Sequence, residues 1–205
     1  MRIYAMVAAG LVAALMGAMG YFMVSGSGAG DDFAACRGGQ VVGEADIGGS
    51  FELVDHTGRT VTDADILTEP ALIYFGFSFC PDVCPLDNAR NARAVDALRE
   101  RGHDIRPVFI SVDPERDTPE MLATFVGMFH DDMIGLTGDA EQVRAAAQAY
   151  RVYYQREETD DDYYLVDHST HSYLVLPGHG FVEFFARDES VDDIAATAAC
   201  YLENA

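Results

Sequence analysis

Two cysteines separated by three residues, Cys80 and Cys84, are the residues best placed to do chemistry in this sequence. They follow an apolar run, 71–77, and precede a helical pattern, so they fall where a strand gives way to a helix. Residues four apart at the start of a helix lie on one face, with β-carbons about 5–6 Å apart. Two thiols at that distance can close a disulfide or hold one soft metal ion, and a helix N-terminus favours the thiolate. The flanking Pro81 and Pro85 argue against two buried cysteines that are close by chance.

The elements that must position this pair alternate between strands and helices. Apolar periodicity and turn residues predict strands over 51–54, 60–61, 71–77, 105–112, 134–137, 172–176 and 181–185, an extended piece over 163–166, and helices over 85–101, 119–129, 140–150 and 191–202. Such an alternation, closed by a hairpin, predicts a mixed sheet covered by helices on both faces. With a dithiol at the end of the first buried strand, the pattern favours a thioredoxin-like α/β fold.

The first 24 residues carry the signal for the compartment. Residues 3–24 contain no charge, and about 20 apolar residues are enough to span a membrane as a helix. Arg2 precedes this run, and Asp31 and Asp32 follow it, so the positive-inside tendency leaves the N-terminus in the cytoplasm. We expect a single-pass anchor in a bacterial inner membrane over 1–24, with the domain in the periplasm. A cleaved signal peptide is the alternative.

The rest of the chain divides by composition. Residues 25–46 form a linker and N-terminal extension that begins with Ser-Gly-Ser-Gly-Ala-Gly, and 47–205 have the length of one domain. The 13 basic and 34 acidic residues give a formal net charge of −21. Such a surface repels nucleic acid, which is therefore excluded as a partner. These charges keep the domain soluble, or alternatively attract a metal cation or a basic partner.

The remaining cysteines, Cys36 and Cys200, suggest a structural bridge. In an oxidising compartment four cysteines allow three pairings. Because Cys80 and Cys84 must cycle if they are the active pair, Cys36 is left to pair with Cys200. We predict that disulfide, and two separate thiols are the alternative.

Other side chains could complete a metal site. Four of the six histidines fall in turns or at helix ends and are expected at the surface, namely His56, His103, His130 and His179. His168 and His171 are three apart, so in an extended segment their rings point to opposite faces and only one can reach the dithiol. Outside the N-terminal segment, Met121, Met128 and Met133 do not cluster as thioether ligands would, and we expect them in the core.

Several longer motifs occur along the chain in a particular order. They are Tyr-Phe-Gly-Phe at 74–77 with Cys-Pro-Asp-Val-Cys-Pro at 80–85, Ser-Val-Asp-Pro-Glu-Arg-Asp-Thr at 111–118, Gly-Leu-Thr-Gly at 135–138, Tyr-Arg-Val-Tyr-Tyr at 150–154 and Val-Asp-His-Ser at 166–169. In this order they resemble the Sco/SenC family of copper-binding assembly proteins for cytochrome c oxidase. The resemblance runs from about Ile47 to Phe185. It departs at His179, where the family has an Asp in its turn.

The resemblance implies a function and a ligand set. It implies a membrane-anchored thioredoxin-like domain that binds one copper ion and helps to load the dinuclear copper site of cytochrome c oxidase subunit II, with other periplasmic copper carriers as further partners. The implied ligands are Cys80, Cys84 and His168, so the resemblance selects His168 over His171. Asp167 could orient a partner or ligand, or could be a solvated acid.

The chemistry of these side chains agrees with copper. Two thiolates and an imidazole suit copper, whereas structural zinc usually takes four protein ligands and no suitable fourth is found. The competing hypothesis is a thiol:disulfide oxidoreductase in which Cys80 and Cys84 reduce the cysteines of the copper acceptor, and a copper or redox sensor is a further alternative. The usual oxidoreductase spacing is Cys-X-X-Cys with a Pro facing the dithiol, and 168–171 contain none. We therefore expect metal delivery as the main role, rather than enzymatic activity.

Overall fold

The computed structural model describes residues 16–17, 19, 21, 33–37, 47–159 and 163–205. The expected membrane span, 1–24, lies almost wholly outside these residues, and the glycine- and serine-rich stretch, 25–30, lies wholly outside them. Within the described part of the chain, no helix combines the length and apolar character needed to cross a membrane. The anchor therefore stays a prediction.

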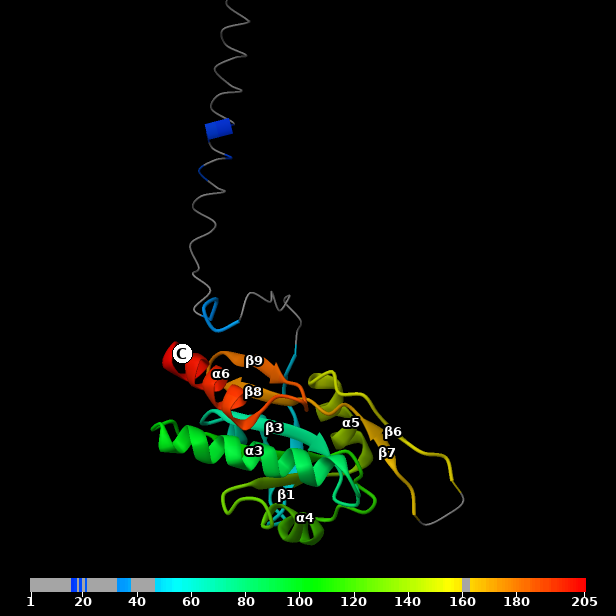
Figure 1. Ribbon diagram of the computed structural model, residues 1–205. Helices are drawn as coiled ribbons and strands as arrows, with labels where there is room; N and C mark the ends of the chain where they lie inside the picture. The colour runs from blue at the N-terminus through cyan, green and yellow to red at the C-terminus, as the bar shows by residue number, and fades with distance from the viewer. Residues whose placement is uncertain (1–15, 18, 20, 22–32, 38–46, 160–162) are drawn as a thin grey trace, which may run out of the picture.

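One seven-stranded sheet forms the centre of the domain (Figure 1). The strands are β1 (Glu52–Asp55), β2 (Thr60–Thr62), β3 (Ala71–Gly76), β4 (Arg106–Ser111), β5 (Ile134–Thr137), β8 (Ser172–Leu176) and β9 (Gly180–Phe185), in the spatial order β2-β1-β5-β4-β3-β8-β9. The β3, β4 and β5 strands run parallel, and the other neighbours pair antiparallel. The predicted mixed sheet and thioredoxin-like fold are confirmed.

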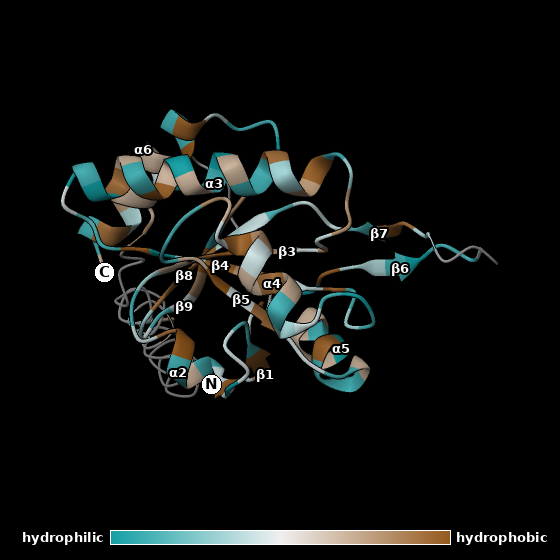
Figure 2. Cartoon of the chain, turned by 90° about the horizontal axis from the view of Figure 1, so that it is seen from below, coloured by the Kyte–Doolittle hydropathy of each residue, from teal (hydrophilic) through white to brown (hydrophobic). Residues whose placement is uncertain are grey.

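Helices cover both faces of this sheet. They are α2 (Asp63–Ile66), α3 (Val83–Glu100), α4 (Pro119–Val126), α5 (Ala140–Ala149) and α6 (Val191–Glu203). Figure 2 shows α3 and α6 on one side of the apolar strands and α5 on the other. Aromatic pairs join the layers. The ring centroids of Phe109 in β4 and Phe125 in α4 lie 4.9 Å apart, and those of Phe75 in β3 and Tyr150 at the end of α5 lie 5.5 Å apart. Burying each such ring contributes about 1.5–3 kcal/mol.

Two helix boundaries differ by two or three residues from the sequence-based expectation. The α3 helix begins at Val83 instead of Pro85, because the first helical N–H groups have no intrahelical partner and a proline in the first turn loses nothing. The α4 helix ends at Val126 instead of Phe129, where the backbone tightens into bonds to carbonyls three residues back. The earlier start of α3 places Cys84 inside its first turn.

A second, two-stranded sheet was not predicted. It pairs β6 (Tyr154–Arg156) with β7 (Val166–His168), and the extended piece expected over 163–166 corresponds to β7 only at its last residue. Both strands are short and largely polar, so they lack the alternation that marks a strand in a sequence. Figure 1 shows this β6–β7 ribbon beside the main sheet and projecting from it.

A disulfide between Cys36 and Cys200 joins the N-terminal extension to α6, as predicted. The two Cα atoms lie 5.6 Å apart. Beside it, the ring of Phe33 packs 5.1 Å from Tyr201 of α6 and 5.2 Å from His179 of the β8–β9 turn. The disulfide therefore holds the backbone of the extension against α6. It also keeps the buried ring of Phe33 packed against Tyr201 and His179.

Candidate metal centre

The cysteine pair lies between the end of β3 and the start of α3. Cys80 is in the connecting loop and half-buried, whereas Cys84 is the second residue of α3 and is completely buried. The backbone N–H of Cys84 donates to Cys80 Sγ over 3.4 Å. A backbone donor at a helix N-terminus stabilises negative charge, so the local fold favours a thiolate at Cys80.

A glycine in β3 makes room for the buried sulfur. A β-carbon added at Gly76 would lie 2.9 Å from Cys84 Sγ, 3.0 Å from the ring of Tyr74 and 3.2 Å from that of Phe109. Contacts this short force a shift in neighbouring atoms. Gly76 is thus the residue that lets Cys84 Sγ pack against the end of the strand.

The two thiols differ in their affinity for a proton. A hydrogen bond from the Cys84 thiol lowers the pKa of Cys80 to about 3, although burial opposes the shift. The same hydrogen bond to Cys80, together with burial, raises the pKa of Cys84 well above its usual range. At neutral pH the reduced pair therefore consists of a thiolate at Cys80 and a thiol at Cys84.

His168 completes a group of three ligand atoms. Its Nε2 lies 3.3 Å from Cys84 Sγ, and the ligand atoms of Cys80, Cys84 and His168 all lie within 4.8 Å of one another. The Nδ1 of His168 lies 2.9 Å from the carbonyl oxygen of Ser169. Because a carbonyl only accepts, Nδ1 carries the proton and Nε2 presents its lone pair to a metal.

This donor set fits a soft metal ion that must be exchanged. Two sulfurs and an imidazole nitrogen suit copper, and three protein ligands leave one side of the ion accessible. Next to Cys80 and His168 is a hollow of about 210 Å³, lined also by Pro81, Asp82 and Asp167. An incoming ligand can approach the three atoms from this hollow.

The β6–β7 ribbon carries His168 to the cysteines. His168 pairs with Tyr154 across the ribbon, and its ring stands edge-on to Phe77 at 5.8 Å. Arg116 fastens the ribbon to the body of the domain, because its guanidinium lies 3.5 Å from the ring of Tyr164 and donates to the Tyr164 carbonyl over 2.9 Å. These contacts place the imidazole, which lies 84 residues after Cys84 in the chain.

A buried carboxylate holds the loop that leads to Cys80. Asp117 is completely buried and accepts hydrogen bonds from the N–H and hydroxyl of Ser78 and from the hydroxyl of Ser111 at the end of β4. Burial raises the pKa of Asp117, although these hydrogen bonds oppose the shift. Ser78 lies two residues before Cys80, so Asp117 ties the cysteine loop to β4.

A second buried carboxylate lies behind the cysteines. Asp87 of α3 is 3% exposed and accepts a hydrogen bond from the hydroxyl of Tyr74 over 3.0 Å, and burial raises its pKa. On the same side of α3, the side chain of Asn88 donates to the Cys84 carbonyl over 2.8 Å. Sequence reasoning did not identify this network. Its signal was present, because Asp87, Asn88 and Asn91 interrupt the apolar side of the predicted helix.

The other histidines lie apart from this group. The ring of His171 packs edge-on against Phe184 of β9, so it points away from the cysteines, as the odd spacing predicts. His179 is exposed as expected, whereas His56, His103 and His130 are at the surface only in part and are partly buried. Their ring nitrogens lie near Gly135 N (3.1 Å), Glu203 Oε1 (3.6 Å) and Asp96 Oδ1 (3.5 Å), respectively.

Two further expectations have different outcomes. Met133 is buried as expected, whereas Met121 and Met128 are 41% and 67% exposed, because they project from the outer side of α4 and from the turn after it. The expectation that these two are core residues was wrong. Asp167 is exposed at the rim of the hollow, where it lines the approach to the site.

Comparison with known proteins places this geometry in a family. The model of the SCO1/SenC family matches residues 40–203. The chain is 53% identical over 173 residues to Protein SenC of Rhodobacter capsulatus, which covers 84% of this chain and 78% of that protein. It is 44% identical over 161 residues to the mitochondrial Protein SCO1 homolog 1 of Arabidopsis thaliana, covering 78% of this chain. The match covers 48% of that plant relative, so this chain spans about half of its length.

A solved structure supports the same relationship. The crystal structure of Arabidopsis thaliana ScoI with copper bound resembles this chain with a TM-score of 0.72 and 42% sequence identity. The alignment covers 77% of this chain and 97% of that one. From its sequence motifs, its fold and its match to the family model over 164 consecutive positions, 40–203, the chain belongs to the SCO1/SenC family.

Proposed function

We propose that this protein binds one copper ion through Cys80, Cys84 and His168 and helps to load the dinuclear copper site of cytochrome c oxidase subunit II. The observation that carries the proposal is the group of two sulfurs and one imidazole nitrogen within 4.8 Å of one another. Related structures, such as that of Arabidopsis thaliana ScoI, are described with copper bound. The three-ligand geometry and the adjoining hollow support transfer rather than permanent retention of the ion.

The proposal includes a location. An apolar run at 3–24 would anchor the chain in the inner membrane, with the domain and its other copper-carrying partners in the periplasm. The Cys36–Cys200 disulfide supports an oxidising compartment, because such bridges persist outside the cytosol. Protease treatment of intact spheroplasts tests this location. Digestion of the domain supports it, and protection until the membrane is lysed contradicts it.

Two substitutions and a matched control test the copper ligands. We expect His168→Ala to weaken copper binding by more than the 10- to 100-fold that is typical of residues supporting a metal ligand, because it removes a ligand itself. Cys84→Ser should do the same, whereas His171→Ala should bind copper like the wild type, since its ring faces Phe184. Binding is measured by competition with a Cu(I) chelator, and oxidase activity in a strain lacking the gene at limiting copper. Full activity of His168→Ala would contradict the ligand assignment.

A thiol:disulfide oxidoreductase is the second candidate function, because Cys80 is a half-exposed thiol with a pKa lowered to about 3. Against it, an imidazole faces the dithiol where thioredoxin relatives place a proline. The same variants separate the two functions. A reductase needs both sulfurs but not the imidazole, so only Cys84→Ser would fail. Copper delivery requires that Cys84→Ser and His168→Ala both fail.

A further inference from the structure

An exposed apolar groove adjoins the loop that carries Cys80. We call it the α4 groove, and its lining residues are Ser78, Phe79, Met121, Thr124, Phe125 and Met128. It has a volume of about 130 Å³, and three of its large apolar side chains reach solvent, with Phe79 39%, Met121 41% and Met128 67% exposed. Methionine side chains adapt to varied shapes and recur at protein-binding surfaces. A hollow of this size admits one large apolar side chain from another protein.

The α4 groove and the metal centre are connected through the loop that carries Cys80. Phe79 directly precedes Cys80, and Ser78 before it is held by the buried carboxylate of Asp117. Asp117 directly precedes Thr118, the residue that caps α4. One wall of the groove and the loop of Cys80 are therefore fixed to the same carboxylate. A side chain seated in the groove would lie at a defined position relative to the cysteine sulfur.

Copper exchange requires contact at this part of the surface. A metal–sulfur bond is about 2.3 Å long, so a partner that takes copper from Cys80 must bring its own ligands to bonding distance. The hollow beside Cys80 and His168 provides an approach to the sulfur, and the α4 groove is lined by Ser78 and Phe79, the two residues before Cys80. An interface centred on Cys80 would cover both.

The charges around the groove select the partner. Exposed acids adjoin it in the chain, with Glu120 next to Met121 and Asp131 shortly after Met128, whereas Asp132 is paired with Arg99. Asp82 lines the hollow next to Cys80. A second copy of this chain, with a formal net charge of −21, would place acids against acids. A partner with basic residues around an apolar side chain would be attracted instead.

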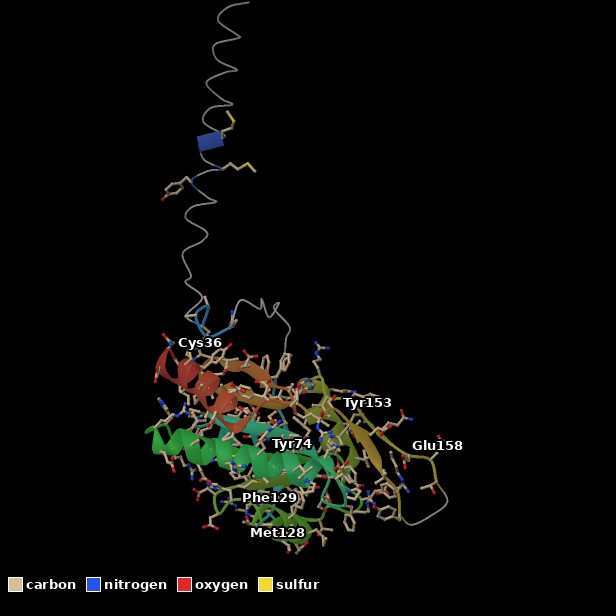
Figure 3. All side chains as sticks on the ribbon, viewed as in Figure 1. Cys36, Tyr74, Met128, Phe129, Tyr153 and Glu158 are labelled. Carbon is tan, nitrogen blue, oxygen red and sulfur yellow. A yellow bond between two sulfur atoms is a disulfide. The ribbon has the colours of Figure 1, made fainter. Side chains whose placement is uncertain are left out.

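The groove also faces away from the N-terminal connection of the domain. Figure 3 places Met128 and Phe129 at one end of the molecule and Cys36 at the opposite end. The described part of the N-terminal extension, Phe33–Arg37, is fastened to α6 at that opposite end by the Cys36–Cys200 bridge. A partner can therefore reach the groove without meeting this extension.

We propose that the α4 groove is the docking site for the protein that exchanges copper with Cys80 and Cys84, and that it receives an apolar side chain flanked by basic residues beside that partner's own copper ligands. This inference rests on the proposed function. An apolar contact of this size, assisted by opposite charges, fits a small interface that forms and dissociates quickly, as repeated transfer requires.

The test measures copper transfer from the loaded full-length chain to the soluble copper domain of oxidase subunit II, the proposed acceptor. Met121→Lys with Met128→Lys places two cations in the α4 groove, against the basic residues of the partner, and Met121→Gln with Met128→Gln removes its apolar character at nearly constant volume. We expect transfer to slow at least tenfold with the lysines and severalfold with the glutamines, at unchanged copper affinity. Raising the salt concentration should slow transfer by the wild type.

Phe184→Lys is the matched control, because Phe184 is exposed to the same extent as Phe79, 39%, but lies on β9, against His171. It should transfer copper like the wild type. Wild-type rates in both double variants would overturn the docking proposal and leave copper binding intact. Loss of copper affinity in the glutamine variant would also overturn it, since the groove would then support the ligands. A dimer that the variants dissociate in ultracentrifugation would assign the groove to a second copy instead. If the wild type binds copper but never loads the acceptor, the proposed function itself fails.

Discussion

At the scale of single residues, the two sulfurs of the site are unequal. Cys80 is half-exposed and favours the thiolate, whereas Cys84 is fully buried and retains its proton. Under the proposed function, incoming copper would meet Cys80 first, and Cys84 would lose its proton only on reaching the metal. His168 offers Nε2 without a change of tautomer, because Ser169 already holds the other nitrogen. The order of ligand binding follows from burial and hydrogen bonding.

The reactivity of Cys80 should be almost independent of pH. Its pKa of about 3 lies below the range from pH 5 to 8, so the thiolate is already present throughout. An ordinary thiol, with a pKa of about 8.5, would react about tenfold faster with each pH unit in most of that range. We expect iodoacetamide to modify reduced, metal-free protein at Cys80 at nearly constant rate, leaving the buried Cys84 intact, as read by peptide mass spectrometry.

Cys84→Ala is the control for this prediction, because it removes the side-chain donor that lowers the pKa of Cys80 most strongly. The modification rate of this variant should regain a dependence on pH in the lower part of the range. A tenfold rise per pH unit in the wild-type protein between pH 5 and 7 would contradict the thiolate assignment.

A methyl group at position 76 should disturb the site directly. In Gly76→Ala the new β-carbon would press on Cys84 Sγ, and overpacking of this kind costs about 1–3 kcal/mol of stability. We expect copper affinity to fall as well, because the sulfur must move. Gly135→Ala is the matched control, with contacts of 3.0–3.1 Å to Val126 and Leu122, away from the cysteines. It should lose similar stability in urea unfolding and keep its copper affinity. Equal copper affinity in both variants would show that Gly76 serves packing alone.

At the scale of elements, the site is assembled from segments that do not support one another locally. The end of β3 and the first turn of α3 bring the cysteines, and the β6–β7 ribbon brings His168. Two residues of the segment after β4 fasten both parts. Asp117 holds the cysteine loop through Ser78, and Arg116 holds the ribbon through Tyr164. We call these two residues, Arg116 and Asp117, the joint of the metal centre, because they hold the cysteine loop and the ribbon in place.

Removing the carboxylate of that joint should loosen the cysteine loop. Asp117→Ala leaves the N–H and hydroxyl of Ser78 and the hydroxyl of Ser111 without their acceptor, and each buried hydrogen bond to a charged group is worth about 1.5–3 kcal/mol. We expect a loss of at least about 3 kcal/mol in urea unfolding, faster hydrogen exchange at the Ser78 amide, and weaker copper binding.

The control for the joint is Asp139→Ala, which removes an exposed carboxylate that caps α5 by accepting from Glu141 and Gln142. It should cost about 1 kcal/mol, as helix caps do, with unchanged copper affinity. Unchanged exchange at the Ser78 amide in Asp117→Ala would contradict the proposed role of the joint.

At the scale of the whole molecule, the disulfide and the metal centre lie in different parts of the domain. The bridge fastens the N-terminal extension to α6. This helix packs beside α3 on the same face of the sheet. The cysteines of the metal centre are at the other end of α3, near its first residues. The Cys36–Cys200 bridge and the Cys80–Cys84 pair therefore lie at opposite ends of the α3 helix.

Removal of the bridge should weaken the fold but spare the site. The cysteines it joins are 164 residues apart, and a loop beyond 100 residues corresponds to about 4–5 kcal/mol in the chain-entropy account of disulfides. We expect the double variant Cys36→Ser, Cys200→Ser to lose stability of that order in urea unfolding and to bind copper at the same stoichiometry. A loss below about 1 kcal/mol, or a loss of copper binding, would contradict this separation.

The sequence by itself determined the elements and the most distinctive part of the site. Apolar runs and capping residues report local preferences, so the buried strands, the helix after Cys84 and the closing hairpin followed from them, with errors of two or three residues at the ends of α3 and α4. The cysteine pair was visible because its two members are neighbours in the chain. The Cys36–Cys200 bridge followed by elimination, since only four cysteines had to be paired.

Only the tertiary structure decided which distant side chains meet. Spacing showed that one of His168 and His171 could face the dithiol, and the resemblance selected His168, but its 3.3 Å approach to Cys84 depends on where the β6–β7 ribbon packs. The same holds for the space at Gly76, the contact of Asp117 with Ser78, and the exposure of Met121 and Met128. The physical reason is that a periodic pattern reports which face of an element is apolar. It does not report which residue of another element lies against that face.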